Sequence, residues 1–259
     1  MWKVKPRTGI GLATVLALLL AWYLATDVAG LIDRQRFPGL GDIWTAGAQI
    51  MTRGYAGGTL VPQALYSLRL VVLGFLVAAG TGVPLGILMG LSRRFEALVN
   101  PAFLLVRPIP PLAWIPLAIV WLGLADSAKV LVIWFAAFVP AVINSHTGIR
   151  NVDRTLIAAG RVHGASQARI VWDVLIPGAM PMIFTGLRLS LQASWTTLVA
   201  AELVGALAGL GRVLNLAQQD IYPAMILVAM ASVAVLGWAT TRCLDMIESR
   251  AMPWLPAQA

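Results

Sequence analysis

Three side chains within one apolar stretch have types and spacing that suit a small oxyanion. Arg188, Gln192 and Trp195 stand at i, i+4 and i+7, so a helix places all three on one face. A guanidinium, an amide and an indole N–H together offer several hydrogen-bond donors to a negatively charged group. An ionisable residue in such a stretch is costly unless it meets polar company. We predict that this face borders a polar space.

Arg188 also has a plainer interpretation. It lies near the start of its apolar run and Glu202 near the end, so each can extend its charge to the nearer membrane surface. Gln192 and Trp195 lie deeper and are not explained in this way. Both interpretations of Arg188 stay open at this point.

No further set of residues indicates catalysis or metal binding. The chain has one cysteine, Cys243, and two histidines, His146 and His163, which stand apart from each other. This pattern offers neither a metal cluster nor a nucleophile paired with a base. A phosphate-binding loop ends in Gly-Lys-Ser or Gly-Lys-Thr, and no lysine here follows a glycine. We expect a chain that is not an enzyme, holds no cofactor and does not itself hydrolyse ATP.

Composition places most of the surface in lipid. Of 259 residues, 59% are hydrophobic and 12% are charged, whereas soluble domains carry about 25% charged residues. The mean hydropathy is +0.82. The net charge of +8 is spread over short connections rather than gathered in a stripe, so nucleic acid is not an expected partner.

The hydropathy pattern predicts an all-α polytopic membrane protein with six transmembrane helices. The first run follows the basic segment Met1–Arg7 and has the outline of a signal peptide. No small-x-small cleavage pattern follows it, so we expect a retained span. The expected spans cover about residues 10–24, 70–91, 101–124, 130–144, 182–202 and 222–240.

The basic residues orient these spans. If both termini lie on the inner side, 12 Lys and Arg residues, Arg107 included, fall in inner segments and six fall in outer ones. This difference is the positive-inside bias. Arg93 and Arg94 mark an inner loop, and Asp126 to Lys129 form an outer turn. The expected location is a bacterial inner membrane with cytoplasmic N and C termini.

Two of the spans have unusual composition. Small residues recur every four positions in the second, at Gly74, Ala78, Gly82, Gly86 and Gly90, a pattern that lets another helix approach closely. The third contains five prolines, which a regular helix cannot hold. Broken backbone at membrane depth is tolerated only inside protein or beside a water-filled cavity. The third span, around Pro110 and Trp114, is therefore expected to face a tight interior or a pathway.

The longest charged segment between apolar runs is 153–181. Asp153 and Ser166 are predicted N-caps of two short helices, and Gly164 suits the left-handed position that ends the first. Ala158, Ala159 and Gly160 leave one face of the first helix nearly free of bulk, and Pro177 and Pro181 are expected to break the second. The prediction is a compact projection with a small-residue surface. A plain solvated hairpin between two spans remains the alternative.

The spacing of Gly164, Val174, Ile176 and Pro177 resembles half of the EAA loop of ATP-binding-cassette (ABC) importer permeases. The first half departs from that pattern, since Ala158, Ala159 and Gly160 replace the usual Glu-Ala-Ala. The resemblance implies a type I ABC importer permease fold whose cytoplasmic coupling helix, within 151–181, sits in a cleft of an ATPase. The implied ATPase-coupling residues are Ala158, Ala159, Gly160, Arg161, His163, Gly164, Ala165, Ser166 and Pro177.

The third-span segment RPIPPLAWIPL is similar to that of permeases for taurine, alkanesulfonate and nitrate uptake, and most similar to taurine permeases. The resemblance implies import of a small organic or inorganic anion, with a sulfonate such as taurine as first expectation. Nitrate, bicarbonate, aromatic acids and a pyrimidine precursor stay open. The expected substrate-pathway residues are Arg188, Gln192, Trp195, Pro110 and Trp114.

The same resemblance implies the partners. They are a second copy of the chain, two ABC ATPase subunits that bind ATP and Mg²⁺, a periplasmic or lipid-anchored solute-binding protein, and membrane lipid. The expected divisions are an N-terminal part over 1–64, a permease core over 65–250 and a tail over 251–259.

Two other functional classes remain as alternatives. They are an ATP-independent secondary transporter or channel, which matching broken helices in two repeats would favour, and an intramembrane enzyme.

Overall fold

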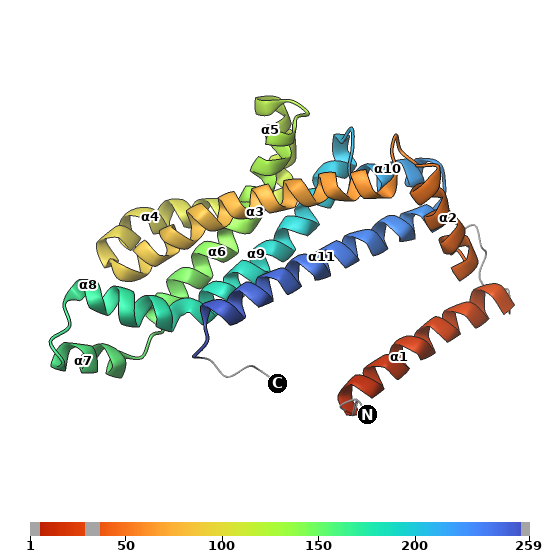
Figure 1. Cartoon of the computed structure of the whole chain (residues 1–259). Helices are drawn as coiled ribbons and strands as arrows, with labels where there is room; N and C mark the ends of the chain where they lie inside the picture. The colour runs from red at the N-terminus through yellow and green to blue at the C-terminus, as the bar shows by residue number, and fades with distance from the viewer. Residues whose placement is uncertain (1–5, 29–36, 255–259) are drawn as a thin grey trace.

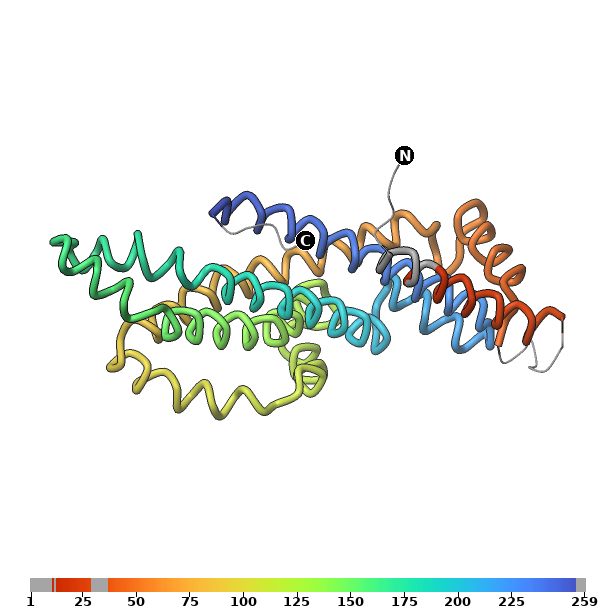
Figure 2. Tube along the Cα trace, turned by 90° about the horizontal axis from the view of Figure 1, so that it is seen from below, coloured from red at the N-terminus to blue at the C-terminus, as the bar shows by residue number. Residues whose placement is uncertain are grey.

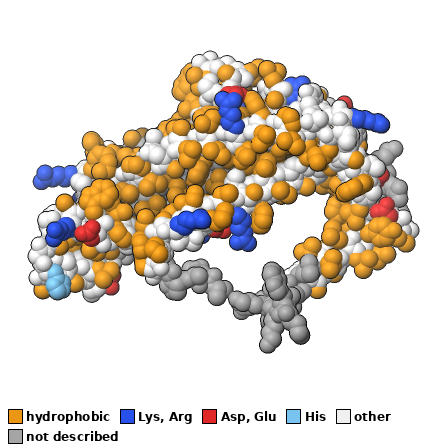
Figure 3. Space-filling model, viewed as in Figure 1, with side chains coloured by type: hydrophobic (Ala, Val, Ile, Leu, Met, Phe, Trp, Pro, Cys, Tyr) orange, Lys and Arg blue, Asp and Glu red, His pale blue; other side chains and the backbone are white. Residues whose placement is uncertain are grey.

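The structure, a computed structural model, describes residues 6–28 and 37–254, and these residues are mainly helical. Four long helices carry the fold: α3 (Leu60–Leu91), α6 (Asp126–Arg150), α9 (Ile176–Gly205) and α11 (Pro223–Ala251). Each is long and apolar enough to cross a membrane. They lie alongside one another in Figure 1 and form one bundle. Hydrophobic side chains cover most of the face seen in Figure 3, as expected for a surface in lipid.

The glycine stripe of α3 packs directly against α6. A Cβ on Gly74 would lie 2.4 Å from Ile133, and one on Gly86 would lie 2.4 Å from the Val142 carbonyl oxygen. Only hydrogen at these positions allows the two backbones to come this close. The predicted role of the stripe in helix packing is therefore confirmed.

A fifth crossing is broken into pieces. α4 (Arg93–Val106) is followed by a short 3-10 turn, η2 (Pro111–Ala113), and by α5 (Trp114–Leu122), with a bend of 74° between the two parts. Figure 2 shows α4 arching away from α6 before α5 returns toward it. The prediction of a proline-broken span is confirmed.

Several predicted boundaries are wrong. Arg93 and Arg94 begin α4 rather than forming a loop, because Ser92 caps the helix by accepting the Phe95 N–H at 3.3 Å. Asp126 and Lys129 form the first turn of α6, not a separate turn. Arg107 lines a cavity beside Phe135 and Pro140 in the middle of α6, and its predicted place on the inner side stays a prediction.

The six-span count is not reproduced in full. Among the described residues, four helices qualify as spans, or five with the bent pair. The first expected span falls on α1 (Pro6–Tyr23) and the π-helical turn η1 (Leu24–Val28), whose apolar part, Ala13–Val28, is shorter than a span. Lys3, Lys5 and the last part of the tail, 255–259, lie outside the described residues.

The two ends of the bundle are built differently. At one end, α2 (Leu40–Thr52) and α10 (Leu210–Gln219) cover the ends of α3, α9 and α11, and this is called the α10 end. At the other end, α6 passes into α7 (Arg154–Val162) and α8 (Gln167–Arg169), which continues through the π-helical segment η3 (Ile170–Leu175) into α9. This is called the α7 end. Figure 1 shows α7 and α8 extending past the neighbouring helices.

Candidate functional site

The segment 153–175 at the α7 end forms a defined projection. Asp153 Oδ1 accepts the Thr155 N–H at 2.8 Å and caps α7, as predicted. Ser166 caps α8 by accepting the Arg169 N–H at 3.4 Å. Each helix start is thus bonded by its own capping side chain, and η3 adds apolar contacts, since Ile170 is buried and Val174 packs on the cluster around Ile149.

The turn between the two helices depends on Gly164. Its φ of +75° is the left-handed conformation that the sequence predicted. The Gly164 N–H donates to the Arg161 carbonyl at 2.9 Å, and the Ala165 N–H donates to the Gly160 carbonyl at 3.0 Å, which together form a Schellman motif. A Cβ on Gly164 would meet no atom within 4 Å, so the backbone conformation rather than crowding favours glycine here.

The predicted small face of α7 is only partly exposed. Ala158 and Ala159 are exposed, but Gly160 is half-buried. A Cβ on Gly160 would lie 3.7 Å from Ile170 and 4.0 Å from Val174, so this glycine faces η3. Gly160 therefore belongs to the seam inside the projection, and its predicted place on the outer face is wrong. Five other predicted coupling residues lie around the turn or beyond it: Arg161, His163, Gly164 and Ser166 are exposed, and Ala165 is half-buried.

The prolines after the projection do not end its second helix. α8, η3 and α9 form one continuous helix over Gln167–Gly205, with half-buried Pro177 at the beginning of α9 and Pro181 inside it. The π-helical segment η3 directly precedes Pro177, and irregular turns of this kind accommodate a residue that lacks an N–H. The prediction that these prolines break the run is wrong.

The three donors on α9 have different environments. The Arg188 side chain pairs with Asp245 and Glu248 of α11, and its Nε lies 3.0 Å from Asp245 Oδ1. Trp195 is 6% exposed, and its indole N–H donates to Thr240 Oγ1 at 3.1 Å. Gln192 is exposed. The structure thus joins Arg188 and Trp195 to α11 and leaves Gln192 free to face another surface. A role of the three in a pathway stays a prediction.

The predicted third-span residues lie at the break. Pro110 precedes η2, and Trp114 begins α5 and stacks on Phe135 of α6, with ring centroids 3.9 Å apart and planes 10° apart. A cavity of about 180 Å³ lies between the break and α6, lined by Trp114, Arg107 and Pro140 among others. The broken backbone therefore borders a space, and the role of this space in a pathway stays a prediction.

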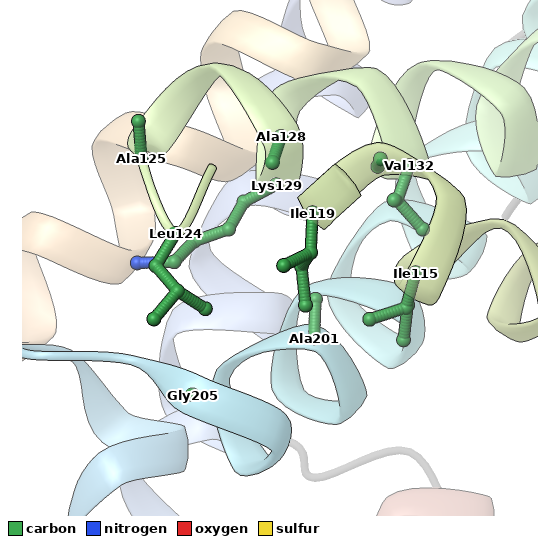
Figure 4. Close-up of a pocket in the computed structure, with 10 residues that line it drawn as sticks. Ile115, Ile119, Leu124, Ala125, Ala128, Lys129, Val132, Ala201 and Gly205 are labelled. Carbon is green, nitrogen blue, oxygen red and sulfur yellow. The ribbon is translucent and has the colours of Figure 1, made fainter. Parts of the chain in front are cut away.

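A second, smaller pocket lies closer to the α10 end. Figure 4 shows it between α5, α6 and α9, with the aliphatic chain of Lys129 along one wall. Its volume of about 20 Å³ has room for a single water rather than a solute. Lys129 is 7% exposed, and its Nζ lies 3.0 Å from the Tyr66 hydroxyl and 3.8 Å from Asp126. This lysine joins α3 to α6.

Glu202 is the polar residue that sequence reasoning misjudged most. Its side chain does not reach for a membrane surface but is 1% exposed. Its carboxylate accepts hydrogen bonds from Ser67 Oγ of α3 at 2.8 Å and from the Gly211 N–H of α10 at 2.8 Å. The Ser67 hydroxyl oxygen in turn accepts the Leu210 N–H at 2.9 Å. Glu202 thus fastens α10 to two spans.

Comparison with known proteins shows which protein family the chain belongs to. Residues 82–252 match the family described as "Binding-protein-dependent transport system inner membrane component". The chain belongs to this family. The match includes α9, α11, the broken span and the whole projection, whereas α1 and α2 precede it.

Two relatives of this permease match over nearly its full length. The taurine transport system permease protein TauC of Escherichia coli (strain K12) is 32% identical over 98% of this chain and 92% of its own. The bicarbonate transport system permease protein CmpB of Synechococcus elongatus is 32% identical over 92% of this chain and 87% of its own. The chain is therefore an ABC importer permease subunit, a membrane component rather than an enzyme.

A solved structure supports the fold of the permease. The inward-facing MetNI methionine ABC transporter contains a chain that superposes with a TM-score of 0.60, over 74% of this chain and 95% of that one. The sequence identity is 21%, so the likeness concerns the fold alone. It confirms the predicted type I ABC importer permease fold.

Proposed function

We propose that this permease is driven by a separate ATPase that binds ATP and Mg²⁺ and that receives the projection in a cleft. The observation that carries this proposal is the projection itself. Its two short helices are largely exposed, are capped at both helix starts and pack mainly on η3, so among the described residues the projection offers a defined outer surface that a partner can reach. Exposed Ala158 and Ala159 allow a groove to approach the backbone closely. The α7 end is then cytoplasmic, with both termini on that side.

Two copies of the chain would form the pathway. The broken span exposes Leu105, Val120 and Trp121 by 60% or more, a face that a second copy or lipid must cover. We infer a homodimer in which the two broken spans approach a shared axis, because irregular backbone is tolerated beside a path and not in lipid. Two ATPase subunits on one side and a solute-binding protein on the other complete the assembly, and the family description, which names a binding protein, supports the second of these partners.

The substrate class we infer is a small oxyanion. Relatives named for taurine and for bicarbonate transport share a negatively charged oxygen group as the common chemistry. A sulfonate such as taurine is the first choice, because the third-span segment RPIPPLAWIPL is similar to that of taurine permeases and because TauC is a relative of this chain.

Substitutions at Gly164 test the coupling role. Gly164→Val forces a β-branched residue into a left-handed conformation and should deform the turn, with uptake in proteoliposomes falling about tenfold or more while the protein remains inserted. Gly164→Asn adds a side chain that tolerates this conformation and is the matched control. An ATPase that co-purifies with wild type and Gly164→Asn, but less with Gly164→Val, supports the proposal. Uptake that is unchanged in Gly164→Val removes the coupling role.

A further inference from the structure

The break in the fifth crossing holds an arginine at mid-depth of the bundle. Arg107 immediately follows α4 and lines the cavity of about 180 Å³, whose α6 wall runs from Phe135 to Pro140. These two residues are each about 14–15 Å along the helix from the nearer end of α6, at 1.5 Å per residue. The cavity therefore lies in the middle third of a membrane-spanning helix.

The charge of Arg107 has no compensating acid among the described residues. Over residues 6–28 and 37–254, no carboxylate lies within 4.0 Å of its guanidinium, and the only hydrogen bond found for it is from its main-chain N–H to the Phe103 carbonyl. Arg150 and Arg188, by contrast, both pair with acids. An unpaired guanidinium at this depth is too costly to face hydrocarbon and calls for water or an anion.

The surroundings of Arg107 favour a small ligand. Trp114 and Phe135 form a stacked apolar wall, and Pro111 and Pro140 complete it. Pro110 and Pro111 lack N–H groups, so the helix cannot close over the break and fill the space. A volume of 180 Å³ is far above the roughly 10–15 Å³ that one water needs, so several waters fit. An apolar cavity with a few charged or polar groups is a common form of small-molecule site, and the exposed Arg107 supplies the charge here.

We propose that Arg107 is an anion-binding residue of a substrate subsite at the break, where its guanidinium receives the oxyanion group of the transported solute. Two of its N–H groups match the oxygens of a sulfonate or bicarbonate. The inference rests on the proposed function and deepens it by naming the residue that meets the charge. A carboxylate from the second copy of the chain is the rival source of compensation, and the experiments below separate the two.

The first experiment measures the charge of the cavity without transport. Cys243 is the only cysteine in the chain, so Cys243→Ser with Ile109→Cys places a single thiol on the cavity wall. The purified permease–ATPase complex in nanodiscs is treated with the anionic sulfonate reagent MTSES or the cationic reagent MTSET. We expect MTSES to react about tenfold faster than MTSET, after correction for their rates with a free thiol. Adding Arg107→Gln should abolish this preference.

The second experiment measures uptake of taurine, methanesulfonate and bicarbonate in proteoliposomes with the binding protein. Arg107→Gln should lower uptake of the transported anion about tenfold or more, as for the loss of one charge-assisted contact. Arg107→Lys should retain an intermediate rate, because it keeps the charge but not the planar fork. Arg94→Gln, at the exposed start of the same helix, is the matched control and should behave as wild type.

Each contrary outcome identifies what is wrong. A thiol at 109 that reacts with neither reagent, or without charge preference, overturns the subsite. The subsite is also overturned if the Arg107→Gln variant takes up the anion as fast as the Arg94→Gln variant. It is overturned as well if Arg107→Gln separates the two copies of the chain, because that result assigns Arg107 to the dimer contact. If the wild-type permease binds no ATPase and shows no ATP-driven uptake, the proposed function fails, and the thiol experiment on the permease alone still decides the charge of the cavity.

Discussion

Glu96 in the first turn of α4 forms an ion pair with Arg150, the last residue of α6. His146 Nε2 lies 3.1 Å from the other carboxylate oxygen of Glu96, as a close contact rather than an aligned hydrogen bond. α4 otherwise packs mainly on α3. Because α7 begins only four residues after Arg150, this pair joins the root of the projection to the start of the broken span.

Reversing this ion pair should reveal a mechanical link. Glu96→Arg places two cations together and should lower ATP-driven uptake about two- to tenfold, whereas Glu96→Arg with Arg150→Glu should restore most of it. Both side chains are about one-quarter to one-third exposed, so the change in thermal stability should stay within about 1 kcal/mol. Uptake and thermal unfolding are measured on the same preparations. A double variant as impaired as the single one excludes the link.

The Ser67–Glu202 contact should matter for stability at the α10 end. Ser67→Ala leaves the buried Leu210 N–H without its acceptor and removes a donor to Glu202, so the free energy of unfolding should fall by about 1–3 kcal/mol. Ser232→Ala is a suitable control, because that hydroxyl bonds only within its own helix. Unfolding in detergent, followed by circular dichroism, compares the two. Equal stability would mean that α10 is held by its apolar contacts alone.

Local rules made the projection predictable from sequence. Caps at Asp153 and Ser166 and the left-handed Gly164 depend on neighbours within a few residues, and all three were correct. The stripe of small residues on α3 was also correct, because helical spacing alone places it on one face. Pro177 was misjudged because the π-helical turn before it leaves no clear mark in the sequence.

Residues whose partners are distant in the chain could not be predicted. Glu202 meets Ser67 from 135 residues away, and Arg188 meets Asp245 from 57 residues away. A charge count also could not place Arg107, because it assumes that a basic residue between apolar runs lies at a surface. The proline cluster around Arg107 was the available signal, since broken backbone at mid-depth implies a polar space there.

Gln192 and Trp195 should respond differently to substitution. Gln192 is exposed on α9, so Gln192→Ala should change uptake with less than about 0.5 kcal/mol effect on stability. Trp195→Phe keeps most of the buried ring but loses the bond to Thr240, so it should cost about 1 kcal/mol. Uptake and thermal unfolding are both measured. If Gln192→Ala transports normally, Gln192 is not part of the pathway.

The N-cap of α7 should give the projection a pH dependence of its own. The Thr155 N–H donates to the ionised Asp153 carboxylate and holds the pKa of that carboxyl below its usual value. A lowered pKa in the folded state means that the stabilising effect is complete above the ordinary Asp value of about 3.9 and is lost as the pH falls through the lower, folded value. Amide hydrogen exchange in α7 should therefore accelerate in acid relative to Asp153→Asn, whose side chain still caps but does not titrate. Comparing the two proteins at each pH cancels the intrinsic change in exchange rate. Identical profiles would show that the charge of Asp153 does not hold α7 in place.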